Sequence, residues 1–224
     1  KRIHFGKLAY RCQNCSALCH TGCKENCATL CLPNVKTPNR GAVSKYTSRE
    51  MNQLQVPALI VHCVKEIEQR GLHEVGSMIE CVNISQKKTK QTDHLNCLSF
   101  FLSVESQIKD LKDRLLKSRS GLFDLSSYDI HLICGVVKDF LRSLSESLLT
   151  DNLWKIFANL VEDEYDLSKQ QKFDSLIQQL PKPNRDTLAF MILHLQRIAS
   201  SSACRMPISN LSRTMVTKNI FVKT

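Results

Sequence analysis

The stretch IHLICGVVKDFLRSL, residues 130–144, decides the fold of this chain. Its apolar side chains recur every three or four residues, the spacing that places them on one face of an α-helix. Three other stretches share this spacing, and no stretch alternates convincingly like a β-strand. The apolar positions of the four stretches are Leu59, Ile60, Cys63, Val64 and Ile67; Val104, Ile108, Leu111 and Leu115; Ile130, Ile133, Cys134, Val137, Leu141 and Leu144; and Leu188, Met191, Ile192, Leu195 and Ile198. We therefore expect a mainly α, all-helical domain with one bundle core.

Local signals mark the ends of these helices and of the domain. Pro57 suits a first helical position and Gly71 a cap at the end of the same helix, while Ser127 and Asn184 are expected N-caps. Residues 32–54 are rich in Pro, Asn, Ser, Thr and Lys and lack apolar periodicity, so they are expected to form a linker.

The first 31 residues carry a different signal, because they hold six of the eleven cysteines of the chain. Five residues form the pattern C-x2-C-x4-H-x2-C-x7-C: Cys12, Cys15, His20, Cys23 and Cys31. Thiolates and imidazole at such short spacings are the ligands of structural Zn²⁺. Buried thiols or disulfides are the alternative, but disulfide domains do not usually include the intervening histidine.

This cysteine pattern resembles the second half of the diacylglycerol-type finger of protein kinase C. The resemblance implies that Cys12, Cys15 and Cys31 share one zinc with an upstream His, and that His20 and Cys23 share another with an upstream Cys pair. Since the chain begins at Lys1 rather than Met, we expect a fragment whose residues 1–31 form a partial finger. Leu8 and Ala9 replace the Gln-Gly pair of lipid-binding members, so we expect no high-affinity diacylglycerol binding.

Charge is concentrated near the start of the chain. The formal net charge is +10, and residues 1–50 account for +7 of it, with nine Lys or Arg and two Glu. Such a region attracts anionic membrane, an acidic protein or nucleic acid, or is simply solvated. The scarcity of aromatic stacking residues there makes nucleic acid an unfavoured partner. No signal peptide or membrane span is apparent, so we expect a cytosolic or nuclear protein.

Four stretches resemble the Rho-family GTPase-activating domain in their order and spacing. They are VPALIVHCVKEIEQRGLHEVG at 56–76, ICGVVKDFLRSLSESLLT at 133–150, LPKPNRDTLAFMILHLQRIA at 180–199 and ISNLSRT at 208–214. The resemblance implies that residues 55–213 form such a domain, truncated at its C-terminal end, with Rho-family small GTPases (Rac, Cdc42 or Rho) as partners. A protein of this kind regulates an enzyme and is not itself one.

The catalytic arginine of the family follows the pattern G-L-x-x-x-G-L-Y-R. This chain matches Gly71, Leu72 and Gly76, but Ile79 stands where the arginine finger is expected. No arginine occurs between Arg70 and Arg114. Because such an arginine contributes about 10³ to 10⁵ in rate, we expect impaired activation.

Two segments depart from the family pattern. Residues 77–103 form an atypical insert and residues 214–224 an atypical tail. Our hypothesis for both is mis-spliced sequence, and a genuine lineage-specific loop is the alternative for the insert.

Three residues match positions that contact the GTPase in this family. Lys138 and Arg142 lie four residues apart and therefore share a helical face. Asn210 matches the Asn of the family's N-L-A motif. A solvated helix face is the alternative for the two cations, and a helix cap is the alternative for Asn210.

The finger, IVHCVKEIEQRGL and NRDTLAF together resemble the cytokinetic members of the family, which act in centralspindlin. That resemblance implies a kinesin partner bound through a preceding region, and a cytoplasmic location at the spindle midzone, midbody and cleavage furrow, with a nuclear pool in interphase. Other functions stay open: a module that binds the GTPase without activating it, a zinc-dependent module that binds a membrane or a protein, and, less favoured, a nucleic-acid-binding zinc protein.

Overall fold

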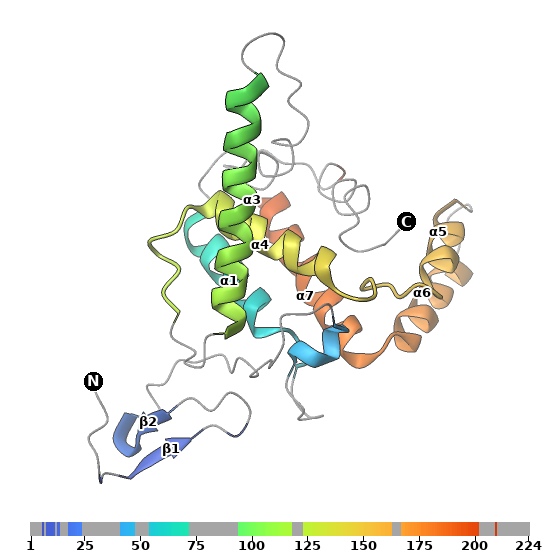
Figure 1. The fold of residues 1–224 in the computed structure, drawn as a ribbon. Helices are drawn as coiled ribbons and strands as arrows, with labels where there is room; N and C mark the ends of the chain where they lie inside the picture. Colours follow the sequence, from blue (N-terminus) through green and yellow to red (C-terminus); the bar gives the residue numbers. More distant parts are fainter. Residues whose placement is uncertain are drawn as a thin grey trace.

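The computed structural model describes residues 6, 8–11, 13, 18–23, 41–47, 54–71, 94–117, 123–162, 167–201 and 209. For residues 94–102, 161–162 and 167 it describes the backbone alone. The elements in chain order are β1 (Ala9–Arg11), β2 (Leu18–His20), η1 (Thr21–Cys23), η2 (Val43–Tyr46), α1 (Ala58–Arg70), α3 (His94–Lys117), α4 (Ile130–Ser143), α5 (Trp154–Glu162), α6 (Leu167–Gln179) and α7 (Lys182–Ser200) (Figure 1). The prediction of a mainly helical fold is confirmed.

Helix α4 is the centre of the core. It packs against α1 and against α3, which crosses in front of it in Figure 1. All six apolar positions expected on its inner face are buried. At Gly135 the helices α3 and α4 approach closely, since a Cβ added there would lie 2.6 Å from Ile108 Cδ1. The sequence in 130–144 thus organises the domain, as its periodicity predicts.

Polar groups hold the C-terminal end of α1 and the N-terminal end of α4. Gly71 ends α1 as predicted, with its N–H donating to the Ile67 carbonyl. The Arg70 guanidinium donates to the carbonyls of Leu125, at 3.2 Å, and Tyr128, at 2.9 Å. The predicted cap Ser127 is wrong, because the carboxylate of Asp129 caps α4 by accepting the His131 N–H at 2.7 Å.

Helix α7 differs from prediction at two positions. Asn184 is not its N-cap: the helix begins after Pro181, and Asn184 is buried within its first turn. Ile192 was expected in the core but is 42% exposed. It neighbours the fully buried Met191, and consecutive helical residues point about 100° apart, so only one of the two faces the core.

Polar contacts tie α7 to the segment that precedes α1. The Gln55 N–H donates to Asp186 Oδ2 at 2.9 Å, and the Thr187 hydroxyl donates to the Gln55 carbonyl at 3.4 Å. Lys182 holds the same Asp186 oxygen at 2.7 Å. The two bonds of Gln55 join residues more than 130 positions apart in the chain.

Part of the expected linker packs against the helices. Val43 and Tyr46 of η2 are buried, and the Tyr46 ring meets Phe140 of α4 edge-on with centroids 4.9 Å apart. The Ser145 N–H donates to the Gly41 carbonyl at 3.1 Å. Two apolar residues are too few to show a periodicity, so sequence analysis could not detect this packing.

Two further pairs of elements each pack together, and the α5–α6 pair contributes Phe157 and Leu176 to the core. Helices α5 and α6 lie side by side in Figure 1, with the rings of Phe157 and Phe173 6.0 Å apart. Strands β1 and β2 form an antiparallel hairpin in which Tyr10 pairs with Cys19. None of the helices in the described ranges is both long and apolar enough to span a bilayer.

Candidate functional site

Arg142, on the last turn of α4, is an exposed cation. It makes no hydrogen bond or ion pair with any residue that the structure describes. Four other arginines are engaged: Arg70 as above, Arg114 with Tyr128 and Asp110, Arg185 with Gln178, and Arg197 with Glu68. Arg142 is therefore available to an external anion or carboxylate.

Lys138, one turn earlier on α4, is in a different environment. It is 4% exposed, so its side chain is buried while that of Arg142 is solvated. The sequence predicted that both cations share one helical face, and the spacing does place them there. Of the two, Arg142 is the residue presented to solvent.

Asp139, the acidic residue that follows Lys138 on α4, already has a partner. Asp139 of α4 forms an ion pair with Lys112 of α3, and the two side chains are only 22% and 14% exposed. This pair ties α3 to α4 beside Gly135. Because Asp139 is held by Lys112, its carboxylate does not neutralise Arg142. Sequence analysis missed the pair, since its members lie 27 positions apart.

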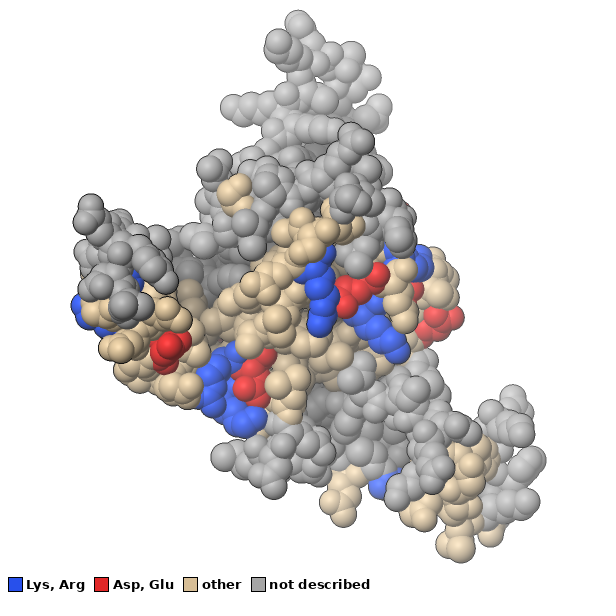
Figure 2. Space-filling model, turned by 180° about the vertical axis from the view of Figure 1, so that it is seen from behind, with Lys and Arg blue, Asp and Glu red and all other residues tan. Residues whose placement is uncertain are grey.

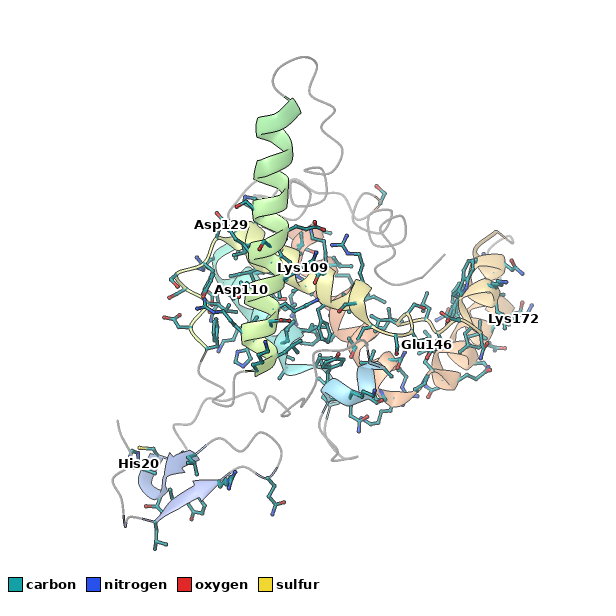
Figure 3. All side chains as sticks on the ribbon, in the orientation of Figure 1. His20, Lys109, Asp110, Asp129, Glu146 and Lys172 are labelled. Carbon is teal, nitrogen blue, oxygen red and sulfur yellow. The ribbon has the colours of Figure 1, made fainter. Side chains whose placement is uncertain are left out.

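The loop after α4 is held from several directions. Glu146, which follows α4 in Figure 3, accepts the Asp151 N–H at 3.3 Å. The buried Asn184 amide donates to the carbonyls of Ser147, at 3.3 Å, and Leu148, at 3.2 Å. Thr150 has a positive φ of 57°, which is strained for a β-branched residue and costs about 1–3 kcal/mol. Such a conformation persists only where its surroundings hold it.

The position expected for the arginine finger, Ile79, lies outside the described residues, as does Asn210. Arg70 is the nearest arginine before that position, and two carbonyls and Glu66 occupy its guanidinium. In this arrangement Arg70 holds the end of α1 in place, so its guanidinium is not free to replace the arginine finger.

Two of the five predicted zinc ligands are described. His20 ends β2 and Cys23 ends η1, and both are partly exposed (Figure 3). Cys12, Cys15 and Cys31 lie outside the described residues. Within the described part, no group of three or more His, Cys, Asp or Glu is placed to hold a metal ion. Two ligands cannot complete a tetrahedral site, so the zinc ligand set stays a prediction.

A charged cluster between α1 and α7 escaped sequence analysis. Glu68 accepts from His194 Nδ1 at 2.9 Å and from Arg197 at 3.0 Å. Burial of the His194 ring lowers its pKa, against the opposing effect of Glu68. Burial opposes ionisation of Glu68, but hydrogen bonds from His194 and Arg197 bring its pKa below the usual value. Since Glu68 is ionised, Nδ1 of a neutral His194 carries the proton and donates it.

Charges of both signs alternate on the surface. Among the described residues on the face that Figure 2 shows, Lys and Arg side chains lie beside Asp and Glu. The described part of this face therefore carries charges of both signs. The concentrated positive charge of residues 1–50 lies mostly outside the described ranges.

Two solved structures share this helical arrangement. Human Rho GTPase activating protein 15 superposes with a TM-score of 0.61 at 23% identity, covering 83% of this chain and 78% of that one. The BH domain of GRAF, the GTPase regulator associated with focal adhesion kinase, gives a TM-score of 0.57 at 20% identity, covering 75% and 79%. At these identities the likeness shows the fold alone.

The RhoGAP domain family matches residues 102–222, more than half of the chain. The chain therefore belongs to the RhoGAP domain family. It is 35% identical to mouse Rac GTPase-activating protein 1 over 217 residues, which cover 95% of this chain and 31% of that protein. It is 31% identical to the active breakpoint cluster region-related protein of Xenopus tropicalis over 172 residues, 76% of this chain and 17% of that protein. The chain thus spans about a third or less of these relatives.

Proposed function

We propose that this chain binds the GTP-bound form of a Rho-family GTPase through a surface that includes Arg142, and thereby regulates GTP hydrolysis. The observation that carries the proposal is the exposed guanidinium of Arg142, which has no partner among the described residues, on the central helix of a RhoGAP domain. A planar guanidinium forms paired hydrogen bonds with a carboxylate, which suits an acidic side chain of the GTPase. The chain is then a regulator of an enzyme and not the enzyme.

Stimulation of hydrolysis by this chain is proposed to be weak. An activator of this class neutralises charge on the transferring phosphate with an arginine, worth about 10³ to 10⁵ in rate or roughly 4–7 kcal/mol. Ile79 stands at the expected position of that arginine, and Arg70 is occupied by the carbonyls of Leu125 and Tyr128. These residues therefore favour a chain that binds the GTPase but accelerates GTP hydrolysis only weakly.

We place the chain in cytokinesis, with a kinesin of centralspindlin as a further partner and the spindle midzone, midbody and cleavage furrow as its location. This part of the proposal rests on the resemblance of the finger, IVHCVKEIEQRGL and NRDTLAF to the cytokinetic members of the family. Zinc bound by Cys12, Cys15, His20, Cys23 and Cys31 would hold the N-terminal module together. The basic N-terminal region would then add weak attraction to anionic membrane.

A paired binding and hydrolysis experiment tests the proposal. Binding of the chain to GTP-loaded Rac, Cdc42 and Rho is measured beside the rate of GTP hydrolysis. We expect Arg142→Glu to weaken binding about 10- to 100-fold, the usual cost of losing a contact cation. Lys172→Glu, a charge reversal on the exposed side of α6 (Figure 3), is the matched control and should leave binding unchanged.

The hydrolysis measurement addresses the missing arginine. The chain should leave the rate near background, and replacing residues 77–103 with a loop that contains Leu-Tyr-Arg should raise it. Acceleration above about a thousandfold by the unmodified chain would contradict impaired activation. Equal affinity of Arg142→Glu and the unmodified chain for all three GTPases would reject the proposed binding surface.

A further inference from the structure

The last turn of α4 carries Arg142, and the loop that follows it determines where that turn ends. Leu144 caps the helix through a bond from its N–H to the Leu141 carbonyl, and its side chain is 1% exposed. One residue later the chain is tied by the Ser145 N–H to the Gly41 carbonyl at 3.1 Å. The backbone therefore leaves α4 along a fixed path, immediately after Arg142.

Asn184 of α7 holds the next part of this path. Its side chain is 7% exposed and makes hydrogen bonds to two consecutive carbonyls, of Ser147 and Leu148. Both neighbours are acceptors, so the NH₂ end of the amide must face them. The residues joined are 36 and 37 positions apart, which makes Asn184 a cross-link between α7 and the loop.

The loop needs such a cross-link because of its backbone. The Ser147 carbonyl also accepts the N–H of Thr150, whose positive φ of 57° is unfavourable for a β-branched residue. The Thr150 carbonyl in turn accepts the Trp154 N–H at 3.3 Å, the bond that leads into α5. Without the Asn184 amide, two buried carbonyls lose a donor and the strained turn loses its support.

We propose that Asn184 is a positioning residue for the GTPase-binding surface, acting through the loop on Arg142. Asn184 itself is buried within the first turn of α7, so the effect must be transmitted through the backbone of residues 143–150. This inference rests on the proposed binding function of Arg142.

A double-mutant cycle tests the proposal. Affinity for GTP-loaded Rac, Cdc42 and Rho is measured for Asn184→Ala, Arg142→Ala and the double variant. We expect Asn184→Ala to weaken binding about five- to tenfold in the unmodified background, the scale of one or two lost hydrogen bonds. In the Arg142→Ala background it should have no further effect, because the residue that it positions is gone.

A control separates positioning from general loss of stability. Phe157→Leu removes packing between α5 and α6, away from α4, and should lower the unfolding midpoint without changing affinity. Hydrogen exchange gives a second readout: in Asn184→Ala the Leu144 and Thr150 amides should exchange faster, while those of α1 keep their protection. If Asn184→Ala does not fold, Asn184→Ser replaces it, since its short hydroxyl cannot reach both carbonyls.

Each outcome decides the question. Equal, additive losses in both backgrounds would show that Asn184 acts independently of Arg142 and would overturn the inference. If Asn184→Ala leaves the affinity unchanged while Arg142→Ala weakens binding as expected, the inference about Asn184 is overturned but the proposed function stands. Unchanged affinity in Arg142→Ala would reject the proposed function and this inference together.

Discussion

Gly135→Ala will weaken the domain, although glycine-to-alanine changes inside helices normally strengthen them. Gly135 lies within α4, where alanine is favoured by about 1 kcal/mol for its helix propensity. The new Cβ, however, would lie 2.6 Å from Cδ1 and 3.0 Å from Cγ1 of Ile108. Favourable contacts between carbon atoms are near 3.5–4.0 Å, so Ile108 must rotate or α3 must move.

The two effects can be weighed. Overpacking in a core costs about 1–3 kcal/mol, and the helix propensity of alanine offsets about 1 kcal/mol of it. We therefore expect a net loss of about 1 kcal/mol in the free energy of unfolding, or a fall of about 2–4 °C in the melting temperature. Urea unfolding followed by circular dichroism measures this as a lower midpoint with an unchanged slope.

The double variant Gly135→Ala/Ile108→Val tests the cause. Valine lacks the Cδ1 atom that makes the closest approach, so most of the clash disappears and the propensity gain remains. Relative to Ile108→Val alone, the double variant should be equally stable or more stable. If Gly135→Ala raises the midpoint in the unmodified background, the close packing of α3 on α4 is wrong.

Three further changes have definite expected outcomes. The hydroxyl of Ser147 is buried without a hydrogen-bond partner among the described residues, so Ser147→Ala should raise the free energy of unfolding by about 1 kcal/mol in urea; a loss would show that the hydroxyl is bonded. Folding lowers the pKa of His194, so the neutral ring contributes its full share to the free energy of unfolding above about pH 6.5. This contribution declines as the pH falls below that value. His194→Gln should flatten the pH dependence of the melting temperature between pH 7 and 5, and an unchanged slope would refute this. Lys112→Met leaves the mostly buried carboxylate of Asp139 unpaired, so it should lower the free energy of unfolding by about 1–3 kcal/mol, measured by thermal unfolding. Lys117→Met removes a solvated ion pair and should change the free energy of unfolding little. Equal losses in the two variants would contradict the burial of the Lys112–Asp139 pair.

The helices of the core could be predicted because burial of one face imposes a period on the sequence. That argument identified six buried apolar positions in 130–144, including Cys134, but it missed Val136 and Phe140, which are buried as well. It failed at Ile192, because a spacing of three or four residues also admits the neighbour of a core position. It could not distinguish the buried Lys138 from the exposed Arg142 either. A spacing of four residues places both side chains on one face of the helix, but how deeply each is buried depends on the elements packed around it.

Long-range polar contacts could not be predicted. Asn184 has the chemistry of a helix cap, and locally that was the reasonable interpretation. Its partners, the carbonyls of Ser147 and Leu148, lie on a loop whose path no short sequence window specifies. Likewise nothing near Glu68 indicates that its partner His194 is 126 positions away. Such pairs are set by tertiary structure, after the helices have been placed.

The attachment of α7 to the start of the domain has a consequence for how the chain folds. Its bonds to Gln55 and Glu68 join residues separated by 126 to 132 positions. At about 5–20 residues per second, a ribosome needs roughly 6–25 seconds to make the α7 partners of these groups after α1 is complete. During that time the carboxylate of Glu68 and the backbone of Gln55 must remain in water. We therefore expect the nascent domain to complete its core only after α7 has emerged.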